Sequence, residues 1–325
     1  MISAEPYRDS MRKDWDSVVA QSANSTFLHY RGFMEYHKDR FADASIMFFN
    51  KGKAFACLPA NWQSDGKSII SHGGLTYGGI VRPAEASVED VGKMLGLAME
   101  YYKSTYKAKS LVYKPTPYIY HKTPCDEDLY CIVKNGGKLL SRAISSAVYL
   151  PQRLNFTTLR KRKCKTANKE GLSVAEYKKD FTTQTYLPEF WNILENVLRN
   201  RHNVNPVHSL DEIASLAMRF PENIVLRTVA DSNRNIVGGT LLFISNNVVH
   251  AQYIAANDEG REKGALDLLF QTVIDEYSQP NGKQKYFDFG ISTEKAGAYL
   301  NEGLIFQKEG FGARGVCYDS YLLEL

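Results

Sequence analysis

The feature that most constrains this sequence is a long internal repeat. Both halves of the chain show the same predicted elements in the same order: a hairpin, a third strand, a helix and a fourth strand. These segments are residues 44–60, 68–81, 87–106 and 110–114 in the first half, and residues 223–244, 247–256, 262–277 and 285–289 in the second. The fourth strands begin 175 residues apart. The sequence therefore predicts two copies of one unit, and the length of the period excludes a solenoid or a propeller.

Predicted helices connect the two halves. Thr158 to Glu170 predicts a helix that ends at Gly171, residues 187–201 form an amphipathic pattern, and Ser209-x-x-Glu212 is a capping box. We expect an α/β fold of two tandem units, each a mixed, mostly antiparallel sheet flanked by helices, with a cleft between them. Residues 1–152 would form the first unit and residues 153–325 the second.

Composition narrows the class of protein. The 325 residues suffice for two domains, and 12% aromatic content excludes a disordered chain. No segment has the run of about 20 apolar residues that an integral membrane span needs, and no signal peptide is visible, so we expect a cytoplasmic protein. The five cysteines contain no C-x-x-C pair, which favours reduced thiols and no metal.

The net charge is +4, but residues 159–170 alone contribute +5, so the rest of the chain sums to −1. This distribution excludes a uniformly basic protein, and we expect no DNA partner. The basic helix has three interpretations: a solvated face, a site for a diphosphate, or a docking surface for the acceptor stem of a tRNA.

The C-terminal segment carries a family resemblance. Tyr286-Phe287-Asp288-Phe289-Gly290 is followed by residues 303–312, GLIFQKEGFG. These motifs, with the element order, resemble the GNAT acyltransferases, and the doubled unit resembles the tandem Fem-type aminoacyl transferases. Lys308 matches a lysine of that family, whereas Gln307 replaces its usual phenylalanine. The resemblance implies an enzyme that transfers an acyl group, with acyl-CoA such as acetyl-CoA as the donor.

The resemblance also suggests a site for the donor. GNAT enzymes hold the donor pyrophosphate at the start of a helix, where unpaired N–H groups favour an anion. Here Arg261, Lys263, Gly264 and Ala265 would form that loop, although the glycines could simply bound a helix. The matching place in the first half, residues 81–86, contains a proline and no glycine. We therefore expect the second unit to bind the donor and the first to present the acceptor.

Three residues are candidates for the chemistry. Lys308 would stabilise the oxyanion, His250 would take the proton of the attacking amine, and Tyr253 would protonate the leaving thiolate. Strand alternation predicts His250 on one face of its strand and Tyr253 on the other. A hydrogen-bonded structural role for His250 remains an alternative.

Five residues are candidates for holding the acceptor, a small-molecule amine or a sugar nucleotide. His72, Thr76 and Tyr77 lie in a glycine-rich stretch that would admit a close ligand or form a bulged edge. Arg160 opens the basic helix and His208 lies in a loop before a capped helix. Zinc at this loop is poorly supported, because no cysteine or carboxylate has ligand-like spacing.

The leading hypothesis is an N-acyltransferase that forms an amide on an amino sugar or cell-envelope precursor, using acyl-CoA. Two alternatives stay open. One is transfer of amino acids from aminoacyl-tRNA to a peptidoglycan precursor, and the other is a GNAT-shaped binding protein without catalysis.

Overall fold

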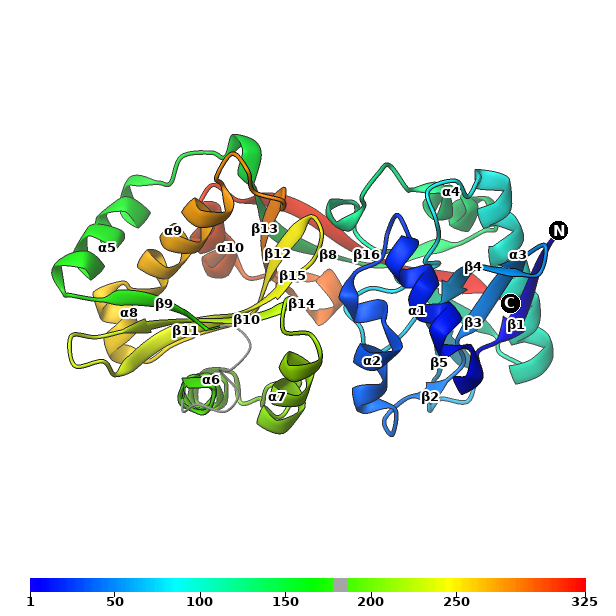
Figure 1. Cartoon of the computed structure of the whole chain (residues 1–325), viewed down its shortest axis with the longest axis horizontal. Helices are drawn as coiled ribbons and strands as arrows, with labels where there is room; N and C mark the ends of the chain where they lie inside the picture. Colours follow the sequence, from blue (N-terminus) through cyan, green and yellow to red (C-terminus); the bar gives the residue numbers. More distant parts are fainter. Residues whose placement is uncertain (178–185) are drawn as a thin grey trace. The chain divides into compact units, whose positions relative to one another are not determined.

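The computed structural model describes residues 1–177 and 186–325, and the side chain of residue 202 lies outside the description. The chain divides into two compact units (Figure 1). Unit 1 consists of Met1–Ile144, Thr293–Tyr299 and Val316–Leu325, and unit 2 of Ser145–Ser292 and Leu300–Gly315. The sequence predicted one boundary after residue 152. The division is instead discontinuous, because the C-terminal strand belongs to unit 1.

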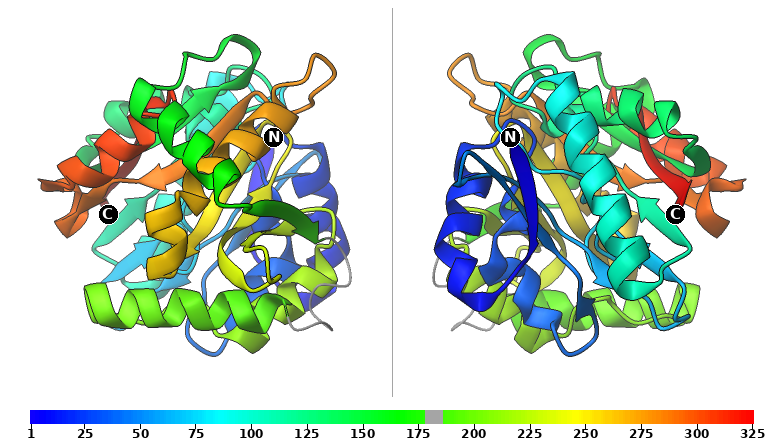
Figure 2. Two further views of the ribbon diagram at one scale, coloured as in Figure 1. Left: turned by 90° about the vertical axis from the view of Figure 1, so that its left-hand side faces the viewer. Right: turned by 90° about the vertical axis from the view of Figure 1, so that its right-hand side faces the viewer.

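Unit 1 is built on two groups of strands. One is the antiparallel group β1-β3-β4, and the other has the order β2-β5-β6-β7-β16. The strands are β1 (Ile2–Pro6), β2 (Ala42–Asp43), β3 (Ile46–Asn50), β4 (Lys53–Leu58), β5 (Asn61–Trp62), β6 (Ser68–Ile70), β7 (Ser110–Tyr113) and β16 (Arg314–Glu324). The helices are α1 (Arg12–Gln21), α2 (Arg31–Met34), α3 (Val88–Tyr106), which is prominent in Figure 2, and α4 (Glu127–Lys134).

Unit 2 contains one sheet in the order β8-β13-β12-β11-β10-β9. Its strands are β8 (Lys138–Tyr149, of which residues 145–149 belong here), β9 (Ser173–Tyr177), β10 (Ile224–Ala230), β11 (Ile236–Ile244), β12 (Val248–Ala256) and β13 (Tyr286–Ile291). Its helices are α5 (Thr158–Lys169), α6 (Tyr186–His202), α7 (Leu210–Arg219), α8 (Asp258–Lys263), α9 (Ala265–Tyr277) and α10 (Glu302–Glu309). A small ladder pairs β14 (Thr293–Glu294) with β15 (Tyr299–Leu300).

Pairing confirms the repeated α/β architecture. β3–β4 and β10–β11 are antiparallel hairpins, and β6–β7 and β12–β13 are parallel pairs joined through α3 and α9. The fourth strand of each repeat then pairs with the final strand of the other: β7 with β16, and β13 with β8. Each unit is therefore completed by a strand that follows the other repeat in the sequence.

Capping residues in the sequence mark the ends of several helices. Ser87 and Ser209 each form the predicted capping box, and α5 ends before Gly171, which has φ +71°. The predicted helix over residues 262–277 differs, because Gly264 at φ +80° separates α8 from α9. Of the predicted strand over residues 68–81, only Ser68–Ile70 is a strand.

The main core of unit 2 lies between α9 and one face of its sheet. Aromatic and aliphatic side chains of α9, β11, β12 and β13 form it, including Phe270, Leu242, Ala251, Phe287 and Phe289. Alternate residues of β12 and β13 consequently point to the opposite face. In the part of the chain that the structure describes, no helix has the length and apolar character required to cross a bilayer.

Candidate functional site

A bulge in β12 decides which of its side chains share a face. Phe243 pairs with His250 and Leu241 pairs with Tyr253, while Gln252 is the extra residue opposite this part of β11. Cross-strand partners point to the same side, and Leu241 and Phe243 are two residues apart. His250 and Tyr253 therefore share the face opposite the α9 core. The prediction that they lie on opposite faces was wrong, because simple alternation assumes a ladder without a bulge.

His250 is held by a buried carboxylate. Its Nδ1 lies 2.9 Å from Oδ2 of Asp288 on the parallel neighbour β13, where the two residues are in register. Asp288 is 0% exposed. Its other oxygen accepts hydrogen bonds from the Ser145 hydroxyl and, at 3.1 Å, from the N–H of Gly290. These contacts fix the carboxylate, and the carboxylate in turn orients the imidazole.

The contact with Asp288 indicates which ring nitrogen of His250 carries the hydrogen. With Nδ1–H donating to Asp288, Nε2 is the ring atom that accepts a proton. The His250 side chain is 17% exposed, so it is accessible to a ligand on this face. From the sequence, Asp288 could be an acid or base group, but a hydrogen-bonding role at a strand end was preferred and Asp288 was not chosen as a site residue. The available signal was a lone carboxylate between Phe287 and Phe289, both of which point into the core.

Lys308 contacts the C-terminal end of β13, the strand that carries Asp288. It is on α10 and only 4% exposed, and its Nζ donates to the carbonyls of Gly290 and Ile291, each at 2.8 Å. Burial lowers its pKa to about 8, while the charge of Asp288 acts in the opposite direction. An ammonium has three N–H donors, and these two carbonyls occupy two. Among the described residues, these two carbonyls are the acceptors that the structure gives for this ammonium.

Tyr253 forms a second pair on this face with His208. The phenol oxygen lies 2.6 Å from His208 Nδ1 and also accepts the backbone N–H of His208 at 3.2 Å. Burial raises the pKa of Tyr253, so the phenol stays protonated. The Trp191 ring packs edge-on against it at 5.1 Å. His208, which the sequence assigned to the acceptor, thus contacts a predicted catalytic residue.

The predicted pyrophosphate loop is helical. The N–H of Gly264 donates to Gly260, and that of Arg261 donates to Asn257 at 3.0 Å. The side chains of the two basic residues, Arg261 and Lys263, form ion pairs within α8, with Asp258 and Glu259. The structure therefore differs from the predicted loop, because the helix itself uses these N–H groups.

The start of α9 is already occupied. The carboxylate of Asp267, in the first turn, accepts a hydrogen bond from Arg160 at 2.7 Å. α5 lies across this end: a Cβ on Gly264 would be 2.9 Å from the carbonyl oxygen of Lys163. An internal carboxylate thus fills the positive end of α9, where the family would hold a diphosphate. Arg160 neutralises that carboxylate.

The predicted acceptor residues of unit 1 have different environments. His72 is buried, and desolvation together with His37 lowers its pKa to about 3. Tyr77 is also buried, and its ring packs at a tilt against that of Tyr120 with centroids 4.7 Å apart, whereas Thr76 is exposed. Their contact with an acceptor stays a prediction. Among the residues described, no three His, Cys, Asp or Glu side chains gather as a metal site.

Comparisons with known proteins agree with this architecture. Residues 157–299 match the model of an acetyltransferase (GNAT) domain. The fold is similar to that of FemX, with a TM-score of 0.66 and 13% identity over 99% of this chain and 97% of that one. It is also similar to the C-terminal domain of a putative lysylphosphatidylglycerol synthetase from Agrobacterium fabrum, with a TM-score of 0.61 and 12% identity over 97% and 91%.

A third similar structure is a tandem GNAT protein from the clavulanic acid biosynthesis pathway, with a TM-score of 0.55 and 9% identity over 100% of this chain and 98% of that one. None of the curated proteins matches the chain in sequence. Residues 157–299 therefore match a GNAT acetyltransferase domain, and the chain as a whole has the fold of tandem, Fem-like GNAT proteins.

Proposed function

We propose that the chain forms an amide by moving an acyl group from an activated carrier to an amine. The observation that carries this proposal is His250, held 2.9 Å from the buried carboxylate of Asp288 beside the ammonium of Lys308. An amine attacks a carbonyl only when it is neutral, and the carbonyl oxygen gains negative charge as it does so. This site combines a proton acceptor with a fixed cation.

The reaction then uses three side chains. His250 Nε2 accepts the proton of the attacking amine as the new C–N bond forms, and the third N–H of Lys308 donates to the oxyanion. The bond from the carbonyl carbon to the carrier breaks, and the leaving oxygen or sulfur takes a proton. Tyr253, protonated and on the same face, is the donor we propose for that step, with His208 holding its hydroxyl.

The carrier is the part of the proposal on which the structure bears most directly. A CoA diphosphate at the start of α9 would meet the carboxylate of Asp267 beneath α5. This observation favours an aminoacyl ester of tRNA over acyl-CoA, although the sequence favoured acyl-CoA. On α5, Lys161, Lys165 and Lys169 are exposed at four-residue spacing.

Like charges at this spacing destabilise a helix by about 0.2–0.5 kcal/mol per pair. Within residues 1–177 and 186–325, none of these three lysines has an acidic partner that would offset the repulsion. A polyanion such as an RNA backbone would offset it. The acceptor we propose is an amine on an amino sugar or a cell-envelope precursor, which the resemblance to Fem-type transferases supports.

The test compares the two carriers directly. The protein is incubated with acetyl-CoA or with mixed aminoacyl-tRNAs, using glucosamine 6-phosphate and a lysine-containing muramyl pentapeptide nucleotide as acceptors, and amides are measured by mass spectrometry. We expect RNA-dependent transfer. The double variant Lys161→Gln/Lys165→Gln should raise KM for tRNA and reduce the salt dependence of binding, with kcat retained. Lys103→Gln, an exposed lysine on α3, is the control.

Two results would revise the proposal. Release of free CoA with acetylation in the absence of RNA would establish acyl-CoA as the carrier. No product with either carrier, despite binding of the acceptor, would favour the binding protein without catalysis.

A further inference from the structure

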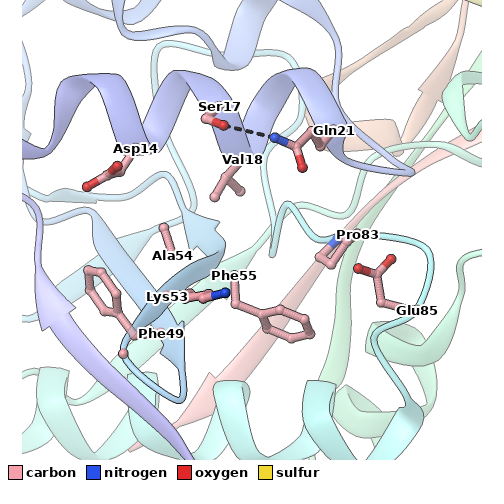
Figure 3. Close-up of a pocket in the computed structure, with 11 residues that line it drawn as sticks. Asp14, Ser17, Val18, Gln21, Phe49, Lys53, Ala54, Phe55, Pro83 and Glu85 are labelled. Atoms are coloured by element: carbon pink, nitrogen blue, oxygen red, sulfur yellow. Dashed lines mark hydrogen bonds between the residues drawn. The ribbon is translucent and has the colours of Figure 1, made fainter.

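Unit 1 contains a pocket of about 400 Å³ that the proposed reaction does not use (Figure 3). One wall is a stripe of α1 with spacing i, i+3, i+4 and i+7: Asp14, Ser17, Val18 and Gln21. The β3–β4 hairpin forms a second wall, and Pro83 and Glu85, before α3, form the third. Ser17 accepts a hydrogen bond from Gln21 at 2.9 Å within the first wall.

Three charged side chains line this pocket. Asp14 and Glu85 lie at opposite sides, and the ammonium of Lys53 lies between them in the view of Figure 3. All three are exposed, and in the described part of the chain none of them forms an ion pair or a side-chain hydrogen bond. The lining therefore carries two negative charges and one positive charge that are free to bind a ligand.

Beside the polar side chains of Ser17 and Gln21, part of the lining is apolar. Val18, Ala54, Phe49 and Phe55 contribute hydrocarbon surface between the charged groups. The position of Lys53 is fixed by the hairpin turn, in which Lys51 and Gly52 have φ angles of +50° and +77°. Two consecutive positive φ angles are typical of the tight turn that joins two twisted strands. Lys53 follows as the first residue of β4.

We propose that this pocket binds an α,ω-diamino acid, the chemical class of lysine and ornithine. Two ammonium groups and one carboxylate complement two carboxylates and one ammonium. The ligand's ammonium groups would pair with Asp14 and Glu85, its carboxylate with Lys53, and its methylene chain would cover Phe55 and Val18. This inference is independent of the proposed acyl transfer.

The second repeat supports a specific role for these charges. Unit 2 has a pocket of about 380 Å³ between α6 and the segment that begins α8, without a wall from its hairpin β10–β11. Its charged lining is Arg201, Arg261 and Asp258, a net charge of +1, whereas that of the unit 1 pocket is −1. The two pockets thus carry opposite net charge. Of these two, the unit 1 pocket suits a cationic ligand.

The test is calorimetric titration of the full chain at low salt with L-lysine. Norleucine lacks the ω-ammonium and cadaverine lacks the carboxylate, and we expect each to bind about tenfold more weakly or worse. Asp14→Asn, Glu85→Gln and Lys53→Met should each weaken lysine binding by about the same factor. Glu100→Gln, an exposed carboxylate of α3 outside the pocket, should leave the affinity unchanged.

The substituted side chains are exposed, so we expect the variants to fold, and circular dichroism checks this. No saturable heat with lysine would overturn the proposal, as would an unchanged affinity in Asp14→Asn and Glu85→Gln. Equal binding of lysine and cadaverine would overturn the role of Lys53.

Discussion

The two units place different chemistry on their fourth strands and on the helices that follow. By sequence offset, Asp288 on β13 aligns with Tyr113 on β7, 175 residues earlier, and Lys308 on α10 aligns with Val133 on α4. In the structure, Tyr113 faces the core formed with α3, whereas Asp288 faces away from the core formed with α9. Tyr113 is fully buried, and its hydroxyl is satisfied by Asp128 at 2.8 Å and by the N–H of Ile80 at 2.7 Å. Val133 is 64% exposed.

The difference shows how one fold becomes either a closed core or a site. In unit 1 the polar groups around Tyr113 satisfy each other and are sealed from solvent. In unit 2 the buried Asp288 instead orients His250, which keeps an accessible ring nitrogen. The same strand order is thus compatible with both, and the residues of the fourth strand and the face on which they lie decide which one forms.

The largest effect should come from removing the proton acceptor. His250→Gln should lower kcat by about 10²- to 10⁴-fold, because an amide side chain cannot accept the amine proton. Tyr113→Phe removes a buried, hydrogen-bonded hydroxyl from the fourth strand of unit 1 and should lower the free energy of unfolding while kcat is retained. Steady-state kinetics measures kcat of both variants, and urea unfolding measures the stability of Tyr113→Phe. If His250→Gln kept its kcat, the contrast between the units would lose its basis.

Replacement of Lys308 should have the next largest effect. Lys308→Met should reduce kcat about a hundredfold, the effect of losing an oxyanion contact worth about 3 kcal/mol. The pKa of Lys308 is about 8, so wild-type turnover should fall as the pH rises above about 8 and the ammonium deprotonates. The variant should lack this alkaline decline.

Val133→Lys is the control for charge alone, since position 133 is exposed on the equivalent helix. It should leave kcat unchanged. A Lys308→Met protein with the wild-type pH profile would show that Lys308 only supports the end of β13.

Acid should weaken unit 1 through its buried histidines. Desolvation lowers the pKa of His29 to about 4 and that of His72 to about 3, so the folded unit keeps both neutral while the unfolded chain binds protons below about pH 6.5. The stability is complete above pH 6.5 and is lost as the pH falls towards these folded-state values. At pH 5 the loss should be about 2 kcal/mol per histidine.

Urea unfolding at pH 7.5 and pH 5 measures this effect. Trp191 is the tryptophan of unit 2, so Trp191→Phe leaves fluorescence from Trp15 and Trp62 of unit 1. An identical transition midpoint at the two pH values would contradict the prediction.

The smallest effect should be a gain of stability. Gly96 lies within α3, and a Cβ there would meet no atom within 4 Å, so Gly96→Ala should stabilise unit 1 by about 1 kcal/mol. Because we place the chemistry in unit 2, kcat should not change. Gly74→Ala is the opposite control, since its Cβ would lie 1.8 Å from His37 Nε2. A thermal melt and an activity assay on Gly96→Ala are sufficient.

Most of the fold could be predicted from the sequence, but less of the site. Helix caps and strand periodicities are local, and they predicted α3, α5, α6 and α7 to within a residue or two. The prediction failed where one extra residue entered a strand, because Gln252 moves Tyr253 to the face of His250. The sequence also predicted that Gly264 lies in a loop that binds the donor. In the structure, this glycine allows α5 to approach closely.

The sequence by itself determined the repeat, the order of elements and the position of Lys308, because each is encoded by residues close together in the chain. Only the tertiary structure decided the partners. Asp288 lies 38 residues from His250 and 143 from Ser145, and Arg160 lies 107 residues from Asp267. Such contacts depend on which strands pair and which helix covers which end, and no local pattern of side chains specifies them.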